Sequence, residues 1–162
     1  MKALFSNFNQ SNIIGLLLNV TIAVTLCLAI NGVIFGLGWD STDTSNPVWF
    51  APQGYFIPVV WIILFAFIGI ARFLLNASGE VANNTKKLLV FLLVFCLAYP
   101  IYTIGLSSEI IGFFGNLATI ALTIFVITRT WQFSKLATTL LVPIVAWVCF
   151  ATLIVMAEIG WI

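Results

Sequence analysis

The sequence predicts an all-α polytopic membrane protein, a bundle of five transmembrane helices that forms a single domain over residues 1–162. Hydrophobic residues make up 62% of the chain and charged residues only 7%. The apolar residues gather in runs of about 20, the length a helix needs to cross a bilayer. This composition excludes a soluble domain with a polar shell. The net charge of +1 gives no reason to expect nucleic acid as a partner.

The first predicted helix covers residues 13–37. It follows a nearly uncharged N-terminus and is longer than the apolar region of a secretory signal, so we expect it to be retained. Gly32 and Gly36 form a small-xxx-small pair near its outer end. Such a pair allows close helix packing either within the monomer or across a homodimer, and both alternatives stay open.

The other four predicted helices cover residues 56–75, 86–106, 110–129 and 136–158. In lipid, each segment must satisfy its own backbone polar groups, and these runs are twice as long as barrel strands, so we expect α-helices. The connections between them are short or modest and polar. Successive helices should therefore be antiparallel neighbours.

The basic residues predict the orientation of the bundle. All six lie in the N-terminal stretch, in alternate connections or in the helix ends that flank those connections, and the remaining connections have none: Lys2, Arg72, Lys86, Lys87, Arg129 and Lys135. Cytoplasmic loops retain Lys and Arg during insertion, which places the N-terminus in the cytoplasm and, after an odd number of spans, the C-terminus outside. The expected location is a bacterial cell membrane.

The first connection, residues 38–55, is predicted to be an outside lid loop. It carries Trp39, Trp49 and Phe50 between polar residues and prolines, whereas solvated linkers rarely hold so many aromatics. A long ordered loop of this kind is usually functional. For Trp39, and equally for Trp131, a place in the interfacial aromatic belt is the alternative.

Two predicted helices carry aromatic residues and prolines on one face. Pro58 and Trp61 share a face of the second helix, and Pro143, Trp147 and Phe150 share a face of the fifth. Trp61 and Trp147 lie too deep for the headgroup belt. The rings either pack against neighbouring helices or wall an apolar cavity, capped by the lid loop, for a large planar or lipophilic ligand.

Polar and metal-binding chemistry is sparse. Tyr99 and Tyr102 of the third predicted helix could add polar handles to the cavity. Cys27, Cys96 and Cys149 lie inside apolar runs without disulfide or metal-ligand spacing, so we expect packing roles for all three. The chain has no histidine, and we expect no metal site and no cofactor.

Two segments resemble the tryptophan-rich sensory protein, or translocator protein (peripheral benzodiazepine receptor), family. The run Trp49-Phe-Ala-Pro-Gln-Gly-Tyr55, followed by Pro58 and Trp61, is similar to the family's loop-to-helix signature. Residues 141–152 are similar to its fifth-helix signature, and the resemblance covers nearly the whole chain. It implies a five-helix bundle, often dimeric, that binds porphyrins and in some members sterols or synthetic lipophilic ligands.

The chain departs from the family pattern at several positions. Gln53 replaces one proline of a pair, Tyr55 replaces an indole, and Cys149 replaces a serine. Val155 stands where the family usually has Asn. No Tyr followed by a basic residue closes the last helix, so sterol recognition by that pattern is not expected.

The function expected from these observations is binding of a porphyrin or another lipophilic planar molecule within the lipid bilayer, with transport or sensing as its use. No catalytic residue is expected, because no acid, base or nucleophile lies at depth apart from the cysteines. Two alternatives stay open: a structural partner of another membrane complex, and an enzyme that degrades a tetrapyrrole. The residues expected to line the ligand site are Trp49, Pro52, Tyr55, Pro58, Trp61, Tyr99, Pro143, Trp147 and Phe150.

Overall fold

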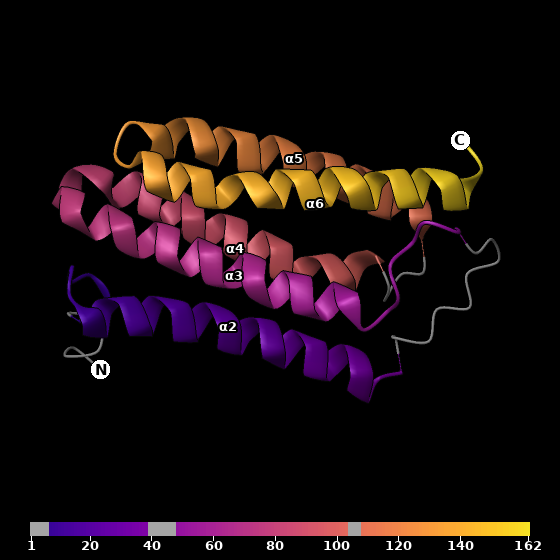
Figure 1. Cartoon of the computed structure of the whole chain (residues 1–162), viewed down its shortest axis with the longest axis horizontal. Coiled ribbons are helices and arrows are strands. Elements are labelled where there is room, and N and C mark those ends of the chain that lie inside the picture. Colours follow the sequence, from indigo (N-terminus) through magenta and orange to yellow (C-terminus); the bar gives the residue numbers. More distant parts are fainter. Residues whose placement is uncertain (1–6, 39–47, 104–107) are drawn as a thin grey trace.

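The computed structural model describes residues 7–38, 48–103 and 108–162. Within these ranges the chain is helical and contains no strand, which confirms the all-α class. Figure 1 shows the long helices lying side by side along the longest axis of the molecule. In chain order the elements are α2 (Ile13–Gly36), α3 (Phe56–Leu74), the 3-10 helix η1 (Leu75–Ala82), α4 (Asn83–Thr103), α5 (Glu109–Trp131) and α6 (Lys135–Ile159).

Four helical segments in the described part of the chain are long and apolar enough to cross a membrane. One of them, Phe56–Ile101, is 46 residues long and runs through α3, η1 and most of α4. The predicted count of five membrane-crossing helices is therefore not confirmed. Within this segment Gly79 has a φ of 60°, a left-handed conformation that glycine adopts without strain. η1 joins α3 and α4 at one end of the bundle, where the two helices lie side by side (Figure 1).

The helix boundaries follow local signals. Asn12, Ser108 and Ser134 are the N-caps of α2, α5 and α6, and each side chain accepts a hydrogen bond from the backbone N–H three residues later. Such caps are each worth about 1 kcal/mol. Gly160 ends α6 with a φ of 79°. α4 begins at Asn83, three residues before its predicted start at Lys86, because the η1 turn is compact.

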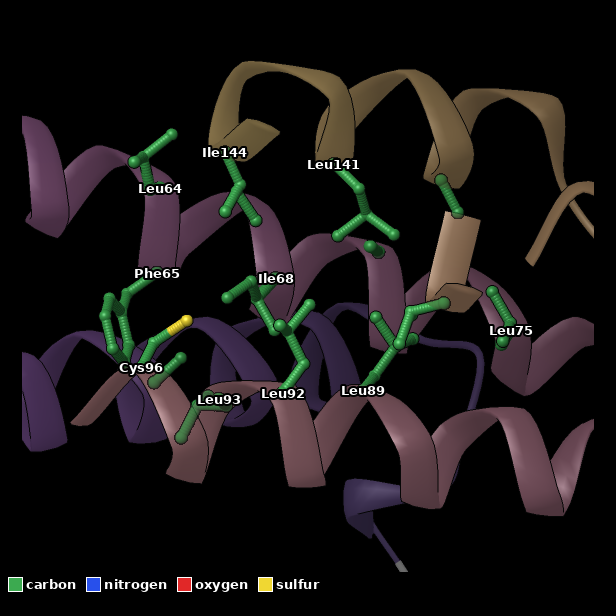
Figure 2. Packing of buried hydrophobic residues seen from close by; sticks show 14 of the residues in the cluster. Leu64, Phe65, Ile68, Leu75, Leu89, Leu92, Leu93, Cys96, Leu141 and Ile144 are labelled. Atoms are coloured by element: carbon green, nitrogen blue, oxygen red, sulfur yellow. The ribbon is translucent and has the colours of Figure 1, made fainter. Parts of the chain in front are cut away.

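The core lies where α3, α4 and α6 meet. Leu141 and Ile144 of α6 point toward α3, and Leu89 and Leu92 of α4 approach α3 from the other side (Figure 2). Ile68 of α3 lies between them and is 1% exposed. α5 packs against both α6 and α4, while α2 packs mainly against α3. Close packing of this kind, more than hydrophobic burial, holds helices together in lipid.

The approach of α2 to α3 depends on Gly69. A Cβ built on Gly69 would lie 2.7 Å from the backbone oxygen of Asn19. A side chain at this position would therefore push the two helices apart. Gly32 and Gly36, in contrast, have no described atom within 4 Å of a built Cβ, so the described residues offer this pair no partner inside the monomer.

One packing prediction was wrong. Cys27 and Cys96 are buried as expected, but Cys149 is exposed on α6. The physical reason is its place on the helix: its neighbour Val148 faces the core, and one residue further turns the side chain about 100° around the axis. Trp131 is 57% exposed at the end of α5, while Trp39 lies outside the described residues.

The described basic residues gather at one end of the bundle, whereas the described acidic residues lie at both ends, with Glu80 in η1. We call the end that holds η1 and the α5–α6 turn the η1 end, and the opposite end, with the chain's last residue, the C-terminal end (Figure 1). The described basic residues Arg72, Lys86, Lys87, Arg129 and Lys135 all lie in helix turns at the η1 end. Glu109 and Glu158 lie at the C-terminal end.

Candidate functional site

A groove of about 400 Å³ lies between α3 and α6 and opens toward the outside of the bundle. This volume is within the range of small-molecule sites, roughly 300–1,000 Å³. We call it the α3–α6 groove. Its lining residues come in equal numbers from the two helices: Val60, Ile63, Leu64, Phe67, Pro143, Ala146, Trp147 and Phe150.

The spacing of the lining residues explains how two helices make one groove. On each helix they follow the same pattern of i, i+3, i+4 and i+7, which places four side chains on one face. Leu64 is 3% exposed and closes the bottom of the groove where α3 meets α6. Figure 2 shows Leu64 close to Ile144 at this contact. Pro143 and Ala146 are exposed at the groove's outer side.

Aromatic rings continue from the groove to the loop before α3. The rings of Trp147 and Phe150 lie 5.8 Å apart at an angle of 44°. Phe150 in turn lies 6.4 Å from Phe50, and Phe50 lies 5.5 Å from Trp49, edge to face. These separations are in the range of attractive aromatic pairs. The described end of the predicted lid loop therefore contacts the groove, while residues 39–47 lie outside the described part.

Of the nine predicted site residues, three line the groove, one reaches it through a neighbouring ring, and the other five lie elsewhere. Pro143, Trp147 and Phe150 line the groove together. Trp49 is 93% exposed and reaches the groove only through Phe50.

The other predicted residues do not line the groove. Trp61 is half-buried, lies against Phe65 at 5.9 Å and packs on the core. Tyr55 is 65% exposed and pairs with Phe56. The remaining three predicted residues are half-buried outside the groove: Pro52, Pro58 and Tyr99. The side chain of Tyr102 lies outside the described part of the chain.

The α3 side of the groove differs from the face that the sequence pattern predicted. The predicted face carries Pro58 and Trp61, whereas Val60, Ile63 and Phe67 line the groove. Their spacing was visible in the sequence. However, α3 is apolar nearly all round, so periodicity could not single out one face.

The groove can hold an apolar ligand but offers little for chemistry. No lining side chain is charged, and the indole N–H of Trp147 is their only polar group. Among the described residues, no cluster of three or more Cys, Asp or Glu side chains could hold a metal ion. The groove therefore supplies stacking surface and apolar contact, not an acid, a base or a nucleophile.

A second arrangement, not expected from the sequence, lies at the η1 end. Arg72 of α3 donates hydrogen bonds from Nη1 to Asn19 Oδ1 at 2.6 Å and from Nη2 to Asn9 Oδ1 at 2.9 Å. Its guanidinium carbon lies 3.6 Å from the centre of the Phe8 ring, a cation–π contact. Arg72 thus fastens the turn before α2 to the α2–α3 pair.

Two asparagines complete this polar cluster. Asn19 Nδ2 donates to the backbone oxygens of Phe8 and Gly15, at 2.9 and 2.7 Å. Asn76 Nδ2 donates to the backbone oxygens of Phe8 and Gln10, both at 3.1 Å. Because both asparagines are buried, these bonds satisfy backbone groups that would otherwise be costly near lipid. The arrangement is a structural anchor for the N-terminal turn and lies away from the groove.

Comparison with known proteins agrees with this architecture. Residues 20–162 match the TspO/MBR family. The chain is also 30% identical over 147 residues to the tryptophan-rich protein TspO of Chlorobaculum tepidum, a match covering 84% of this chain and 90% of that protein. The matched region includes most of α2 and every later helix, and with them the α3–α6 groove. The chain therefore belongs to the TspO/MBR family and is a multi-pass integral membrane protein.

Proposed function

We propose that this protein binds a planar lipophilic small molecule of the porphyrin or tetrapyrrole class in the α3–α6 groove. The observation that carries the proposal is the meeting of two matched apolar helix faces, with the Trp147 and Phe150 rings on one of them. Flat rings favour a flat ligand, because stacking adds to apolar burial. Each aromatic contact adds about 0.5–1.5 kcal/mol beyond the area that it buries.

The surroundings of the groove support binding from the bilayer. The groove opens outward from the bundle, and Ile63, which lines it, is 48% exposed. Trp147 lies 12 residues from each end of α6, about 18 Å along the axis, so a ligand there would sit near mid-membrane. Phe50, packed on Phe150, would act as the inner part of the lid over the ligand.

The proposal includes the arrangement expected from the sequence. The protein crosses the membrane five times, with α3 and α4 as separate spans and the N-terminus in the cytoplasm. The basic residues at the η1 end support this orientation. Gly32 and Gly36, which have no partner among the described residues, would allow a homodimer through α2. In this proposal, binding serves transport or sensing.

The test compares Trp147→Ala with Trp131→Ala by porphyrin titration of the purified protein. Loss of the Trp147 indole should weaken binding roughly ten- to a hundredfold, from lost stacking plus part of its burial. Trp131 is 57% exposed and packs beside Lys135 at the η1 end, so its loss should leave the affinity unchanged. Both variants must first retain the helicity and oligomer size of the parent.

Equal affinities for the parent and a well-folded Trp147→Ala protein would refute the groove as the ligand site. Copurification of other subunits, with no porphyrin binding by the parent, would favour the role in assembly.

A further inference from the structure

We infer that the α3–α6 groove holds one acyl chain of a bilayer phospholipid when no other ligand occupies it. The occupant is the hydrocarbon of the membrane itself, and the headgroup of that lipid takes no part in binding. This occupancy is independent of the proposed function. Only its consequence, that a porphyrin must displace the chain, rests on that function.

The groove runs in the direction in which lipid chains lie. Its lining residues extend from Val60 to Phe67 on α3 and from Pro143 to Phe150 on α6, about 10 Å along each helix axis. Both helices lie along the long axis of the bundle (Figure 1). The hydrocarbon core of a bilayer is about 30 Å thick, so one leaflet is about 15 Å deep. The groove therefore accommodates most of the length of one acyl chain.

The lining of the groove fits hydrocarbon and not water. All eight lining side chains are aliphatic or aromatic, and the indole N–H of Trp147 is their only polar group. A buried water needs about two to four polar partners, which these side chains do not supply. Apolar side chains that face no partner atoms lose their dispersion contacts. A lipid chain restores these contacts at no cost in buried polar groups.

The groove is continuous with the surface that faces the lipid. Ile63, Pro143 and Ala146 line the groove and are exposed. Beside the groove, exposed apolar side chains continue on both helices: Val59, Val142 and Leu153. None of these six positions carries a polar or charged side chain. A lipid chain can therefore enter the groove sideways without crossing a polar rim.

The walls of the groove hold a chain more firmly than an ordinary helix surface does. A chain in the groove contacts α3 on one side and α6 on the other, whereas a chain on the outer face of α5 contacts one helix. Because dispersion contacts add up, the chain between two walls is held more strongly. Leu64 is 3% exposed and closes the bottom, so the chain does not pass into the core. At the C-terminal end, Phe150 meets the ring of Phe50 at 6.4 Å, which limits how far the chain extends.

The experiment is photolabelling of the full-length protein in nanodiscs. The discs contain a phospholipid with a diazirine near the end of one acyl chain, and mass spectrometry of the digested protein locates the labels. The reference is the lipid-facing side of α5 within residues 114–125, which is exposed but lies outside the groove. Per exposed area, labelling within residues 60–67 and 143–150 should exceed this reference at least about threefold.

A matched pair of variants tests whether the groove causes this excess. Ala146 lines the groove at an exposed position, so Ala146→Phe places a ring in the groove without disturbing the core. Ala121 is exposed on α5, and Ala121→Phe adds the same ring outside the groove. Ala146→Phe should lower groove labelling to the level of the reference, whereas Ala121→Phe should leave the excess unchanged. Both variants must retain the helicity and oligomer size of the parent.

Addition of protoporphyrin IX to the parent, under argon, tests the link to the proposed function. The porphyrin should remove the excess labelling of the groove, with α5 as the internal reference for the light that it absorbs. If it binds without removing the excess, the acyl-chain site stands and the groove is not the porphyrin site.

Groove labelling that is no greater than the α5 reference would overturn the inference, whatever the porphyrin does. An excess that persists in well-folded Ala146→Phe would overturn it as well.

Discussion

Replacing Arg72 with Met should loosen the N-terminal turn from the bundle. Met keeps an unbranched side chain of similar reach but removes the charge and the three hydrogen bonds that Arg72 donates to Asn19, Asn9 and the backbone oxygen of Phe8. Asn19, which is 3% exposed, would lose the donor to its Oδ1 atom. The Phe8 ring would lose the guanidinium that lies 3.6 Å from its centre. The turn over residues 7–10 would then keep the bonds that Asn19 and Asn76 donate to its backbone oxygens.

The expected magnitude follows from these contacts. A buried acceptor without its donor costs about 1–3 kcal/mol, and a partly exposed cation–π contact adds about 0.5–1 kcal/mol. Two effects reduce the loss. Arg72 Nε is buried without a hydrogen-bond partner, and Met removes the cost of holding a half-buried charge. We expect a net loss of about 1–3 kcal/mol in the free energy of unfolding.

The assay is reversible unfolding in mixed micelles, followed by circular dichroism, with hydrogen exchange of the peptide that contains residues 7–15. Exchange there should accelerate in Arg72→Met. Arg129→Met is the matched control, because Arg129 is exposed and lies 5.1 Å from the Phe125 ring. Its effect should stay within about 0.5 kcal/mol.

A double-mutant cycle with Asn19→Ala isolates the central bond of the cluster. The coupling between Arg72 and Asn19 should be at least about 0.5 kcal/mol. Additive effects of the two substitutions, or equal destabilisation by Arg72→Met and Arg129→Met, would refute the anchoring role of the cluster.

Three further predictions follow from the packing, the charge pattern and the loop contact. Gly69→Ala should lower the free energy of unfolding by about 1–3 kcal/mol, because the new methyl would overlap a backbone oxygen of α2. Gly36→Ala should leave the stability of the monomer unchanged, because a Cβ there meets no described atom, and thermal unfolding of the monomer distinguishes the two variants. Reporter fusions at Lys86 and Asp43 should report opposite sides of the membrane, with Lys86 inside, and an outside signal there would contradict the proposed topology. Phe50→Ala should weaken porphyrin binding about three- to tenfold through the loss of one aromatic contact, and an unchanged dissociation constant would remove the loop from the site.

The sequence predicted the helices well because lipid imposes a strong pattern on them. Long apolar runs separated by polar turns placed the ends of α2 and α3 within about a residue of their observed positions. α6 also showed its groove face in advance, since its two large aromatic residues, Trp147 and Phe150, share it.

The α3 face and the polar cluster could not be predicted in the same way. Hydrophobic residues surround α3, so Trp61 attracted attention although it packs on the core, while Val60 and Phe67 line the groove. Arg72 binds partners more than 50 residues away along the chain, and one of its contacts is with the backbone oxygen of Phe8. Tertiary contacts of this kind leave no periodic pattern in the sequence.

The most direct test of ligand binding in the α3–α6 groove is quenching in two single-tryptophan proteins. The chain has six tryptophans, and five are replaced by Phe to leave only Trp147 or only Trp131. Trp147 lines the groove, whereas Trp131 adjoins Lys135 at the η1 end, about 18 Å away along α6. A saturating porphyrin bound in the groove should quench Trp147 almost completely, at one ligand per chain, and more strongly than Trp131. Stronger quenching of Trp131 than of Trp147 would contradict the account.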